Sequence, residues 1–297
     1  MGIVIAAIAE HQPAVAIIDS IQTIRSSEIE SETGGVSQIR AVTVRLLETA
    51  KKSGTPVIII GHITKDGSLA GPKTLEHLVD TVLYLEGDAN NFYRLLRGFK
   101  NRFGSTDEIG VFEMTSGGMK EVANPSAALL EELSANPGAV VAATMEGNRP
   151  LLLEIQALVN KTSFGYPNRR SVGFDQNRLS LLIAVLSRRA KIDLGSYDVY
   201  LNVVGGLEVD DPGTDLAAAA AIVSASLDKA PPPKTVFIGE IGLSGEVRRT
   251  KALEKRLEEA AKLGLQKAVV PKLKNKINTK LQLIEIDHIM ELAKLFK

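Results

Sequence analysis

A short apolar run near the start of the sequence ends in a carboxylate that could take part in phosphate chemistry. The run 14–18 is typical of a buried strand, and Asp19 follows it directly. Mg²⁺ is often held by one carboxylate together with the phosphates of a nucleotide, so a strand-end aspartate suits such a site. The phosphate-binding loop that should accompany it, Gly-x4-Gly-Lys-Ser/Thr, does not occur in this sequence. A turn-forming aspartate is therefore the alternative interpretation, and a chain that begins downstream of that loop is the interpretation we favour.

Two cations with one residue between them form a second candidate site. Lys100 and Arg102 flank Asn101 in the segment KNRFG. Residues two apart in an extended segment point to the same side, so both side chains can reach one anion. Two solvated cations at a strand end are the alternative.

Basic clusters recur in the second half of a chain that has no net charge. Lys and Arg number 35, as do Asp and Glu, so an anionic partner would have to be held by a local patch or by an assembled ring. The clusters are Arg169 with Arg170, Arg178, Arg188 with Arg189 and Lys191, and Arg248 with Arg249 and Lys251. Aromatic residues make up 4% of the chain, so we expect phosphate contacts to outweigh base stacking in any nucleic-acid complex. A solvated helix or turn is the alternative for each cluster.

The composition narrows the class of protein. There are no cysteines, which excludes disulfides, thiol chemistry and a cysteine zinc site in this chain and fits a cytoplasmic location. No apolar run approaches the roughly 20 residues that a membrane span needs. The apolar start, residues 1–19, lacks a basic region, and we interpret it as part of a core and not as a signal peptide.

The elements that must position these residues change in character along the chain. In the first 120 residues short apolar runs alternate with a helical pattern over 39–50, which indicates βαβ units and a parallel sheet. A segment rich in Asn, Pro, Ser and Ala follows, and we expect a linker at 123–138 between domains 1–122 and 139–297. The later segments predict an α+β domain. Its expected strands are 139–146, 151–159, 198–204, 235–239 and 267–270, and its expected helices are 177–191, one from Thr214, 252–263 and one after Asp287.

Three segments of the first half resemble the bacterial RadA (Sms) family. They are AIIDSIQT at 16–23, GHITKDGSLAGPKTLEH at 61–77 and KNRFG at 100–104, and the similarity extends over essentially the whole chain. Full-length members carry an N-terminal four-cysteine zinc finger and the phosphate-binding loop, so we expect a truncated sequence whose zinc belongs to the missing finger. The resemblance implies that residues 1–122 are the C-terminal part of a RecA-like ATPase domain.

The resemblance also implies a role for each candidate residue of the first half. Asp19 would be the Walker B carboxylate that places Mg²⁺ beside ATP, and His62 would sense the γ-phosphate from a strand end. Lys100 and Arg102 would act in trans on the ATP of a neighbouring subunit. Lys65 and Lys73 would contact DNA from the loop 64–73. A plain surface loop and an ordinary strand-end histidine are the alternatives.

Two segments of the second half, 199–225 and 239–264, resemble the Lon protease domain. That enzyme uses a serine nucleophile and a lysine base, and superposing the motifs puts Thr214 and Glu254 at these positions. Neither residue suits the chemistry, because Thr214 is better explained as a helix N-cap and Glu254 supplies no cation. Lys251 and Lys255 are the nearest cations. We therefore expect a Lon-protease-like domain at 139–297 that is not a protease.

Together these features predict a DNA-dependent ATPase that drives single-strand translocation or branch migration in recombinational repair. By the resemblance it would form a hexameric ring on single-stranded or branched DNA, with a recombinase filament as a candidate partner and no membrane contact. The basic clusters, above all Arg169, Arg170, Arg248, Arg249 and Lys251, would line its DNA platform. We expect this fragment to bind ATP weakly. The alternatives are a non-catalytic DNA-binding and ring-forming module and, last, an active Lon-like peptidase.

Overall fold

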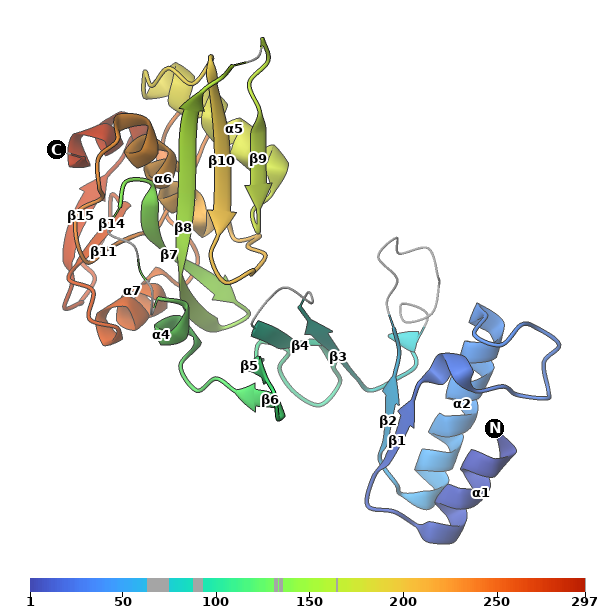
Figure 1. Ribbon diagram of the computed structural model, residues 1–297. Helices are drawn as coiled ribbons and strands as arrows, with labels where there is room; N and C mark the ends of the chain where they lie inside the picture. The colour runs from blue at the N-terminus through green and yellow to red at the C-terminus, as the bar shows by residue number, and fades with distance from the viewer. Residues whose placement is uncertain (63–74, 88–92, 131–132, 134–135, 164, 297) are drawn as a thin grey trace. The chain divides into compact units, whose positions relative to one another are not determined.

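The computed structural model describes residues 1–62, 75–87, 93–130, 133, 136–163 and 165–296 (Figure 1). The chain forms two compact units, the first comprising 1–83 with 98–106 and the second 84–97 with 107–297. Strands β3 (Thr81–Glu86) and β4 (Tyr93–Asn101) each run from one unit into the other. The division that the sequence suggests, with a linker at 123–138, stays a prediction.

The first unit is built around a parallel pair of strands joined by a helix. Strand β1 (Ala16–Asp19) pairs with β2 (Val57–Ile60), and α2 (Val36–Ser53) connects them, as expected (Figure 1). The helix packs because its buried residues Ile39, Val42 and Leu46 recur at helical spacing. It ends at Gly54, whose φ of 71° is the left-handed conformation that glycine adopts readily.

The start of the chain corrects one expectation. Residues Gly2–His11 form a helix, α1, and not buried core, because Ile8 is its only buried residue and Ile3 is 87% exposed. The outer face of the strand pair is also open: Ile17 is 60% exposed and Ile58 51% exposed. The first unit therefore buries one face of its strand pair, and the other remains apolar and accessible.

The second unit contains a seven-stranded mixed sheet in the order β15-β14-β11-β7-β8-β10-β9. Its strands are β7 (Ala139–Glu146), β8 (Arg149–Lys161), β9 (Arg169–Val172), β10 (Tyr197–Val203), β11 (Thr235–Phe237), β14 (Lys267–Pro271) and β15 (Gln282–Ile286). A short pair, β12 (Glu240–Ile241) and β13 (Val247–Arg248), and a sheet in the order β3-β4-β5-β6, with β5 (Ile109–Thr115) and β6 (Gly118–Glu121), complete the strands. The mixed α/β class with parallel strands is thus confirmed, while its Lon-protease-like identity stays a prediction.

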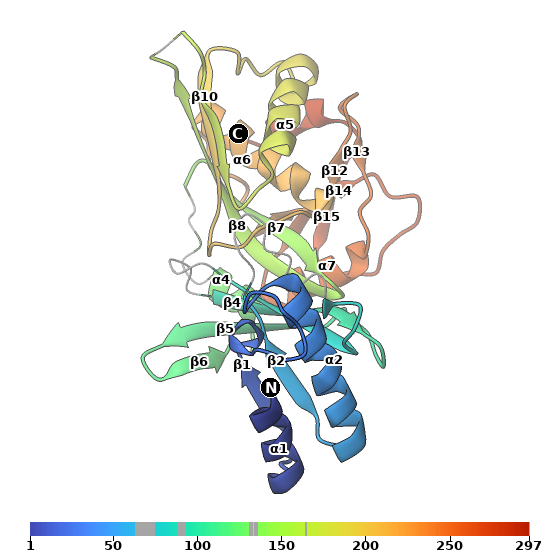
Figure 2. The same cartoon turned by 90° about the vertical axis from the view of Figure 1, so that its right-hand side faces the viewer.

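Helices cover the two faces of this sheet unequally. Helices α5 (Gln176–Arg189) and α6 (Asp215–Leu227) lie against one face, where they bury Val140, Ile155 and Leu201 (Figure 2). The 3₁₀ helix η3 (Ile289–Leu295) packs on the same face and replaces the closing α-helix that the sequence suggests.

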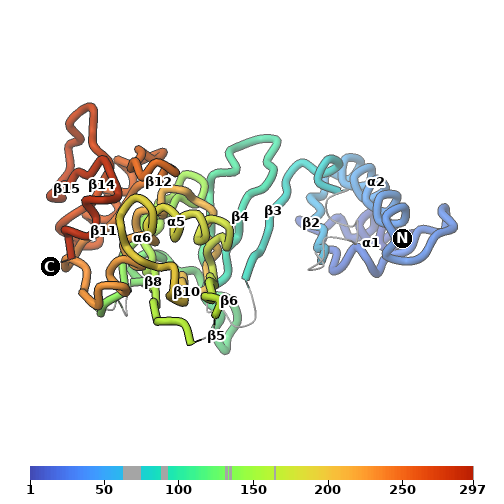
Figure 3. Tube along the Cα trace, turned by 90° about the horizontal axis from the view of Figure 1, so that it is seen from above, coloured from blue at the N-terminus to red at the C-terminus, as the bar shows by residue number. Residues whose placement is uncertain are grey.

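The opposite face is covered over only part of the sheet. Helix α7 (Leu253–Lys262) covers strands β7, β11 and β14. Strands β11 and β14 lie between β7 and the edge strand β15, and Figure 3 shows β11, β14 and β15 on the side of the sheet away from β8 and β10. The short helix α4 (Pro125–Leu129) packs against β8. The far half of β8, with β10 and β9, has an exposed outer face on which Leu158 is 63% exposed. None of the helices in the described part of the chain is long and apolar enough to cross a membrane.

Candidate functional site

The candidate phosphate site lies at the carboxyl ends of the two parallel strands. Asp19 is the last residue of β1 and pairs across the sheet with Ile60, which is the last residue of β2. His62 follows two residues later, and its carbonyl accepts a hydrogen bond of 3.4 Å from Gln22 Nε2 in the short 3₁₀ turn η1 (Ile21–Thr23). Asp19 and His62 are both exposed. Because carboxyl ends of parallel strands meet at one sheet edge, the fold brings the carboxylate and the histidine to the same edge.

The cations of the KNRFG segment each hold a partner within the first unit. Lys100 Nζ donates to the carbonyls of Glu76 at 2.7 Å and Val79 at 2.8 Å. Arg102 lies in the turn after β4 and forms an ion pair of 3.3 Å with Asp80. The two side chains thus fix the segment 76–80 and do not share one acceptor in this state. Lys65 and Lys73 lie outside the described residues.

The two positions that the protease resemblance singled out are both engaged elsewhere. Thr214 is fully buried, and its Oγ1 donates to the carbonyl of Asp211 at 2.8 Å. It occupies the N-cap position of α6, but its side chain accepts no capping hydrogen bond. Glu254 lies in the first turn of α7 and is exposed, where it pairs with Arg249 at 2.5 Å. A hydroxyl that is buried and already donating is poorly placed to attack a peptide carbonyl.

A buried ion pair follows Thr214 directly. Asp215 is 1% exposed and receives two hydrogen bonds from the guanidinium of Arg178, one of them 2.7 Å long, and a third of 3.0 Å from the amide of Ile241. Burial raises the pKa of Asp215, and the bonds from Arg178 and Ile241 oppose that shift. The bond to Asp215 in turn raises the pKa of Arg178. The guanidinium of Arg178 is therefore paired with a buried carboxylate, and this member of the basic clusters is already neutralised within the fold.

A second ion pair precedes Thr214, and sequence reasoning missed it. Its arginine is buried and its aspartate is partly buried. Arg256 is 1% exposed, and its Nη2 lies 2.6 Å from Asp211 Oδ2. Asp211 also accepts from the amides of Gly213 and Met145 at 2.8 Å. The available signal was the position of Arg256 on α7, where it shares the buried face with Leu253, Leu257 and Ala260. A cation on the apolar face of an amphipathic helix indicates a buried partner.

The basic clusters differ in how much charge they leave available. Arg248 pairs with Glu246 and Arg249 with Glu254, so two of the three cations in that cluster are compensated. Lys251 is exposed and forms no ion pair with any described residue. At the end of α5, Arg188, Arg189 and Lys191 are exposed and equally without an ion pair in the described ranges.

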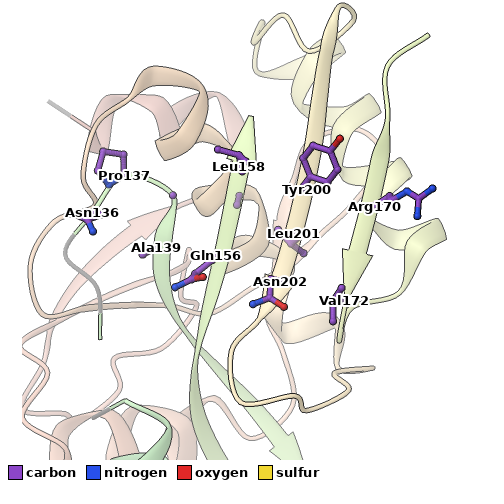
Figure 4. Close-up of a pocket in the computed structure, with 12 residues that line it drawn as sticks. Asn136, Pro137, Ala139, Gln156, Leu158, Arg170, Val172, Tyr200, Leu201 and Asn202 are labelled. Carbon is purple, nitrogen blue, oxygen red and sulfur yellow. The ribbon is translucent and has the colours of Figure 1, made fainter. Parts of the chain in front are cut away.

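The remaining cluster lies on the edge strand β9. Arg169 and Arg170 are both exposed there, opposite Val199 and Tyr200 of β10. Because alternate residues of a strand face opposite sides, the two guanidinium groups belong to opposite faces of the sheet. Arg170 lines a groove of about 590 Å³ on the open face of β8, β10 and β9 (Figure 4). The sequence pattern did not predict this groove.

One buried carboxyl outside these groups is strongly perturbed. Burial raises the pKa of Glu146 to about 7, although Arg97 lowers it and the acidic neighbours Glu86, Asp210 and Asp211 raise it further. Arg97 bridges Glu146 and Glu86, lying 2.8 Å from the latter. No group of three or more histidine or acidic side chains suited to a metal occurs among the described residues.

Comparison with known proteins adds independent evidence. The protein family described as subunit ChlI of Mg-chelatase matches residues 169–274, within the second unit. Proteins named "DNA repair protein RadA" match far more of the chain. The one from Bacillus subtilis strain 168 is 51% identical over 272 residues, which is 91% of this chain and 59% of the relative.

Two further relatives of the same name agree with it. RadA of Streptococcus pneumoniae R6 is 53% identical over 88% of this chain and 62% of its own length. RadA of Halalkalibacterium halodurans C-125 is 50% identical over 89% of this chain and 58% of its own length. The chain thus spans about three fifths of the length of these curated relatives.

Proposed function

We propose that this chain belongs to the RadA family and is part of a DNA-repair ATPase, because about nine tenths of it is 50–53% identical to proteins named DNA repair protein RadA. The observation that carries the proposal is the pair of strand ends that places Asp19 and His62 at one edge of the parallel sheet. Ligands of open α/β sheets bind at the carboxyl ends of strands, which is where a nucleotide phosphate would meet these two side chains.

Asp19 alone would not hold Mg²⁺, so the residues present fit a Mg²⁺–ATP site only if the phosphates of the nucleotide supply further ligands. Asp19 would supply one carboxylate, and no described group of three metal-binding side chains competes for that role. Bound Mg²⁺ supplies charge neutralisation on the phosphate oxygens. His62 would donate to a γ-phosphate oxygen from the neighbouring strand end. The sequence contains no Gly-x4-Gly-Lys-Ser/Thr loop, so this chain by itself would bind ATP weakly.

Lys100 and Arg102 would complete the ATP site of a neighbouring subunit in a hexameric ring. In this chain they bind the carbonyls of Glu76 and Val79 and the carboxylate of Asp80, so action in trans requires that they exchange these partners. The exposed ion pair between Arg102 and Asp80 is weak enough for such an exchange.

The second unit would act as a DNA-binding and ring-forming platform without proteolysis. The burial of Thr214 between the Asp211–Arg256 and Asp215–Arg178 pairs supports this reading, because the Thr214 hydroxyl already donates to the carbonyl of Asp211. The exposed cations at the end of α5 and on β9 would contact the phosphates of single-stranded or branched DNA. The ring would drive translocation or branch migration, with a recombinase filament as its candidate partner.

A non-catalytic DNA-binding and ring-forming module is the second candidate, and the missing phosphate-binding loop is the observation in its favour. DNA-stimulated ATP hydrolysis separates the two candidates when it is measured on a protein that contains this sequence and has the length of the RadA relatives. The substitution Asp19→Asn, numbered as here, is expected to lower the rate by about 10² or more, as loss of a metal-positioning or charge-stabilising group typically does. Asp228→Asn, in the turn after α6, is the matched control and should leave the rate unchanged. If ATP hydrolysis survives Asp19→Asn, the assignment of Asp19 to the Mg²⁺–ATP site is wrong.

A further inference from the structure

The groove on the open sheet face combines features that suit unpaired nucleobases. Tyr200 of β10 lines the groove and stands directly opposite Leu158 of β8 and Arg170 of β9. Two residues along, Asn202 stands opposite Gln156 and Val172 in the same way. Because directly opposed residues on one face of a sheet are close neighbours, these six side chains form one continuous surface.

We propose that this groove, defined by Tyr200, Leu158, Arg170, Asn202, Gln156 and Val172, binds single-stranded DNA by stacking a base on Tyr200. The inference rests on the proposed role of the second unit as a DNA platform, and it deepens that role by assigning contacts to bases as well as phosphates. The volume of about 590 Å³ is within the ~300–1,000 Å³ range of small-molecule sites, so it accommodates a nucleoside.

The exposure of the apolar side chains argues for a ligand on this face. Leu158 is 63% exposed and Val172 62%, whereas Tyr200 is 37% exposed and so is partly held by its neighbours. Apolar side chains gathered on one face of a sheet mark a binding surface. A partly held aromatic ring loses little conformational entropy when a base stacks on it.

The charge of the groove selects an anionic partner. Among the residues that the structure describes, Arg170 is the only charged one in the lining, and it forms no ion pair with any of them. Figure 4 shows its side chain extending outward from β9, away from Tyr200. A strand whose base lies over Tyr200 would therefore place a phosphate toward the outer edge of β9, where the guanidinium is.

The polar groups of the groove match the edges of bases. Asn202 and Gln156 carry both donors and acceptors, which suits hydrogen bonding to exposed base edges. Gln156 already donates to the buried Glu154 at 2.6 Å, and this bond fixes its orientation. In a duplex the base faces are stacked and inaccessible, so single strands are the form of nucleic acid that this surface can bind.

The experiment measures anisotropy of two labelled oligonucleotides of equal length and charge, oligo-dT and its abasic counterpart, titrated with the 297-residue chain. Tyr200→Ala is expected to weaken binding of oligo-dT by at least about fivefold, since stacking on an aromatic contributes roughly 1–3 kcal/mol per base. Binding of the abasic strand should not change. Tyr200→Phe, which keeps the ring, is the matched control and should stay within about twofold.

Arg170→Gln provides a second, independent readout. Removing one phosphate contact to a single strand is expected to reduce the slope of log affinity against log salt by about 0.7, equally for both oligonucleotides. Light scattering and circular dichroism establish that each variant keeps the fold and assembly state of the parent chain.

Each other outcome contradicts a defined part of the argument. If the chain binds both strands but Tyr200→Ala changes neither affinity, the base-stacking groove is wrong and the DNA platform stands. If Tyr200→Ala instead dissociates an oligomer and weakens both strands alike, the groove is a contact between copies of the chain. If the unmodified chain binds neither strand at low salt, the platform itself is wrong, and the groove falls with it.

Discussion

Replacing Arg256 with methionine is expected to destabilise the second unit by about 3 kcal/mol. Arg256 is 1% exposed and donates to Asp211 at 2.6 Å and to the carbonyls of Ala143 and Lys251. Breaking a buried ion pair by removing one partner costs about 3–5 kcal/mol, because the remaining charge is left uncompensated. Methionine keeps most of the volume, so a cavity contributes little to the change.

The lower end of that range follows from what Asp211 retains. Its oxygens still accept hydrogen bonds of 2.8 Å from the amides of Met145 and Gly213 after Arg256 is removed. Asp211 is also 16% exposed at its side chain, so water reaches it in part. Adding Asp211→Asn to the variant removes the stranded charge, and the double variant should recover part of the lost stability.

Arg249→Met is the matched control for burial. Arg249 pairs with Glu254 of α7 at 2.5 Å, but both side chains are about half exposed, so the loss should not exceed about 1 kcal/mol. Urea unfolding followed by circular dichroism gives the midpoints, and hydrogen exchange in β7 and α7 assigns the transition to the second unit. Equal midpoints for the two variants would refute the reasoning, because burial is the property in which the two pairs differ most.

Three further outcomes are expected. Burial raises the pKa of Glu146 from an ordinary 4.5 to about 7, so the folded state binds this proton more tightly than the unfolded state does. The stability of the parent chain relative to the Glu146→Gln variant should therefore fall as the pH rises from about 4.5 to about 7. A difference between their urea midpoints that stays constant with pH would contradict this. The chain should not cleave casein, and cleavage that disappears in Thr214→Ala would contradict the buried hydroxyl. Gly138→Ala should lower the urea midpoint much more than Gly264→Ala. Both glycines have positive φ, but only at Gly138 would a Cβ clash with the carbonyl oxygen of Ala157; equal losses would contradict a role for this contact.

The elements that the sequence predicts well are those whose burial is periodic. Strand β7 occupies the expected residues 139–146 because both of its faces are covered, which produces a continuous apolar run. Helix α2 was equally clear, since Ile39, Val42 and Leu46 mark one face and Gly54 the end. In both cases the local pattern and the tertiary packing agree, so propensity alone leads to the right element.

The elements that the sequence hides lack such a pattern. Strand β9 is four residues long and begins with Arg169 and Arg170. Its pairing with β10 depends on the tertiary structure, so the local sequence pattern does not predict it. Helix α1 has an apolar sequence but only Ile8 is buried, so its composition suggested a core that this fold does not build around it. The groove over Tyr200 was not predictable for a related reason. Alternation of apolar and polar residues predicts that a strand has an outer face, but it does not predict whether a helix covers that face.

The environment of Thr214 gives a physical reason to expect no proteolysis at the position that the Lon-protease resemblance singled out. Acyl transfer requires positive potential where the oxyanion forms, and the N-terminus of a helix such as α6 would supply it. Here Asp211 and Asp215 flank Thr214, and each carboxylate is neutralised by its own arginine from another element, Arg256 or Arg178. The positive end of the helix and both guanidinium groups thus hold these two carboxylates. The same contacts join α5 to α6 through Arg178 and Asp215, and join α7 to β7 through the hydrogen bond from Arg256 to the carbonyl of Ala143. A substitution that frees Thr214 would therefore first loosen the fold.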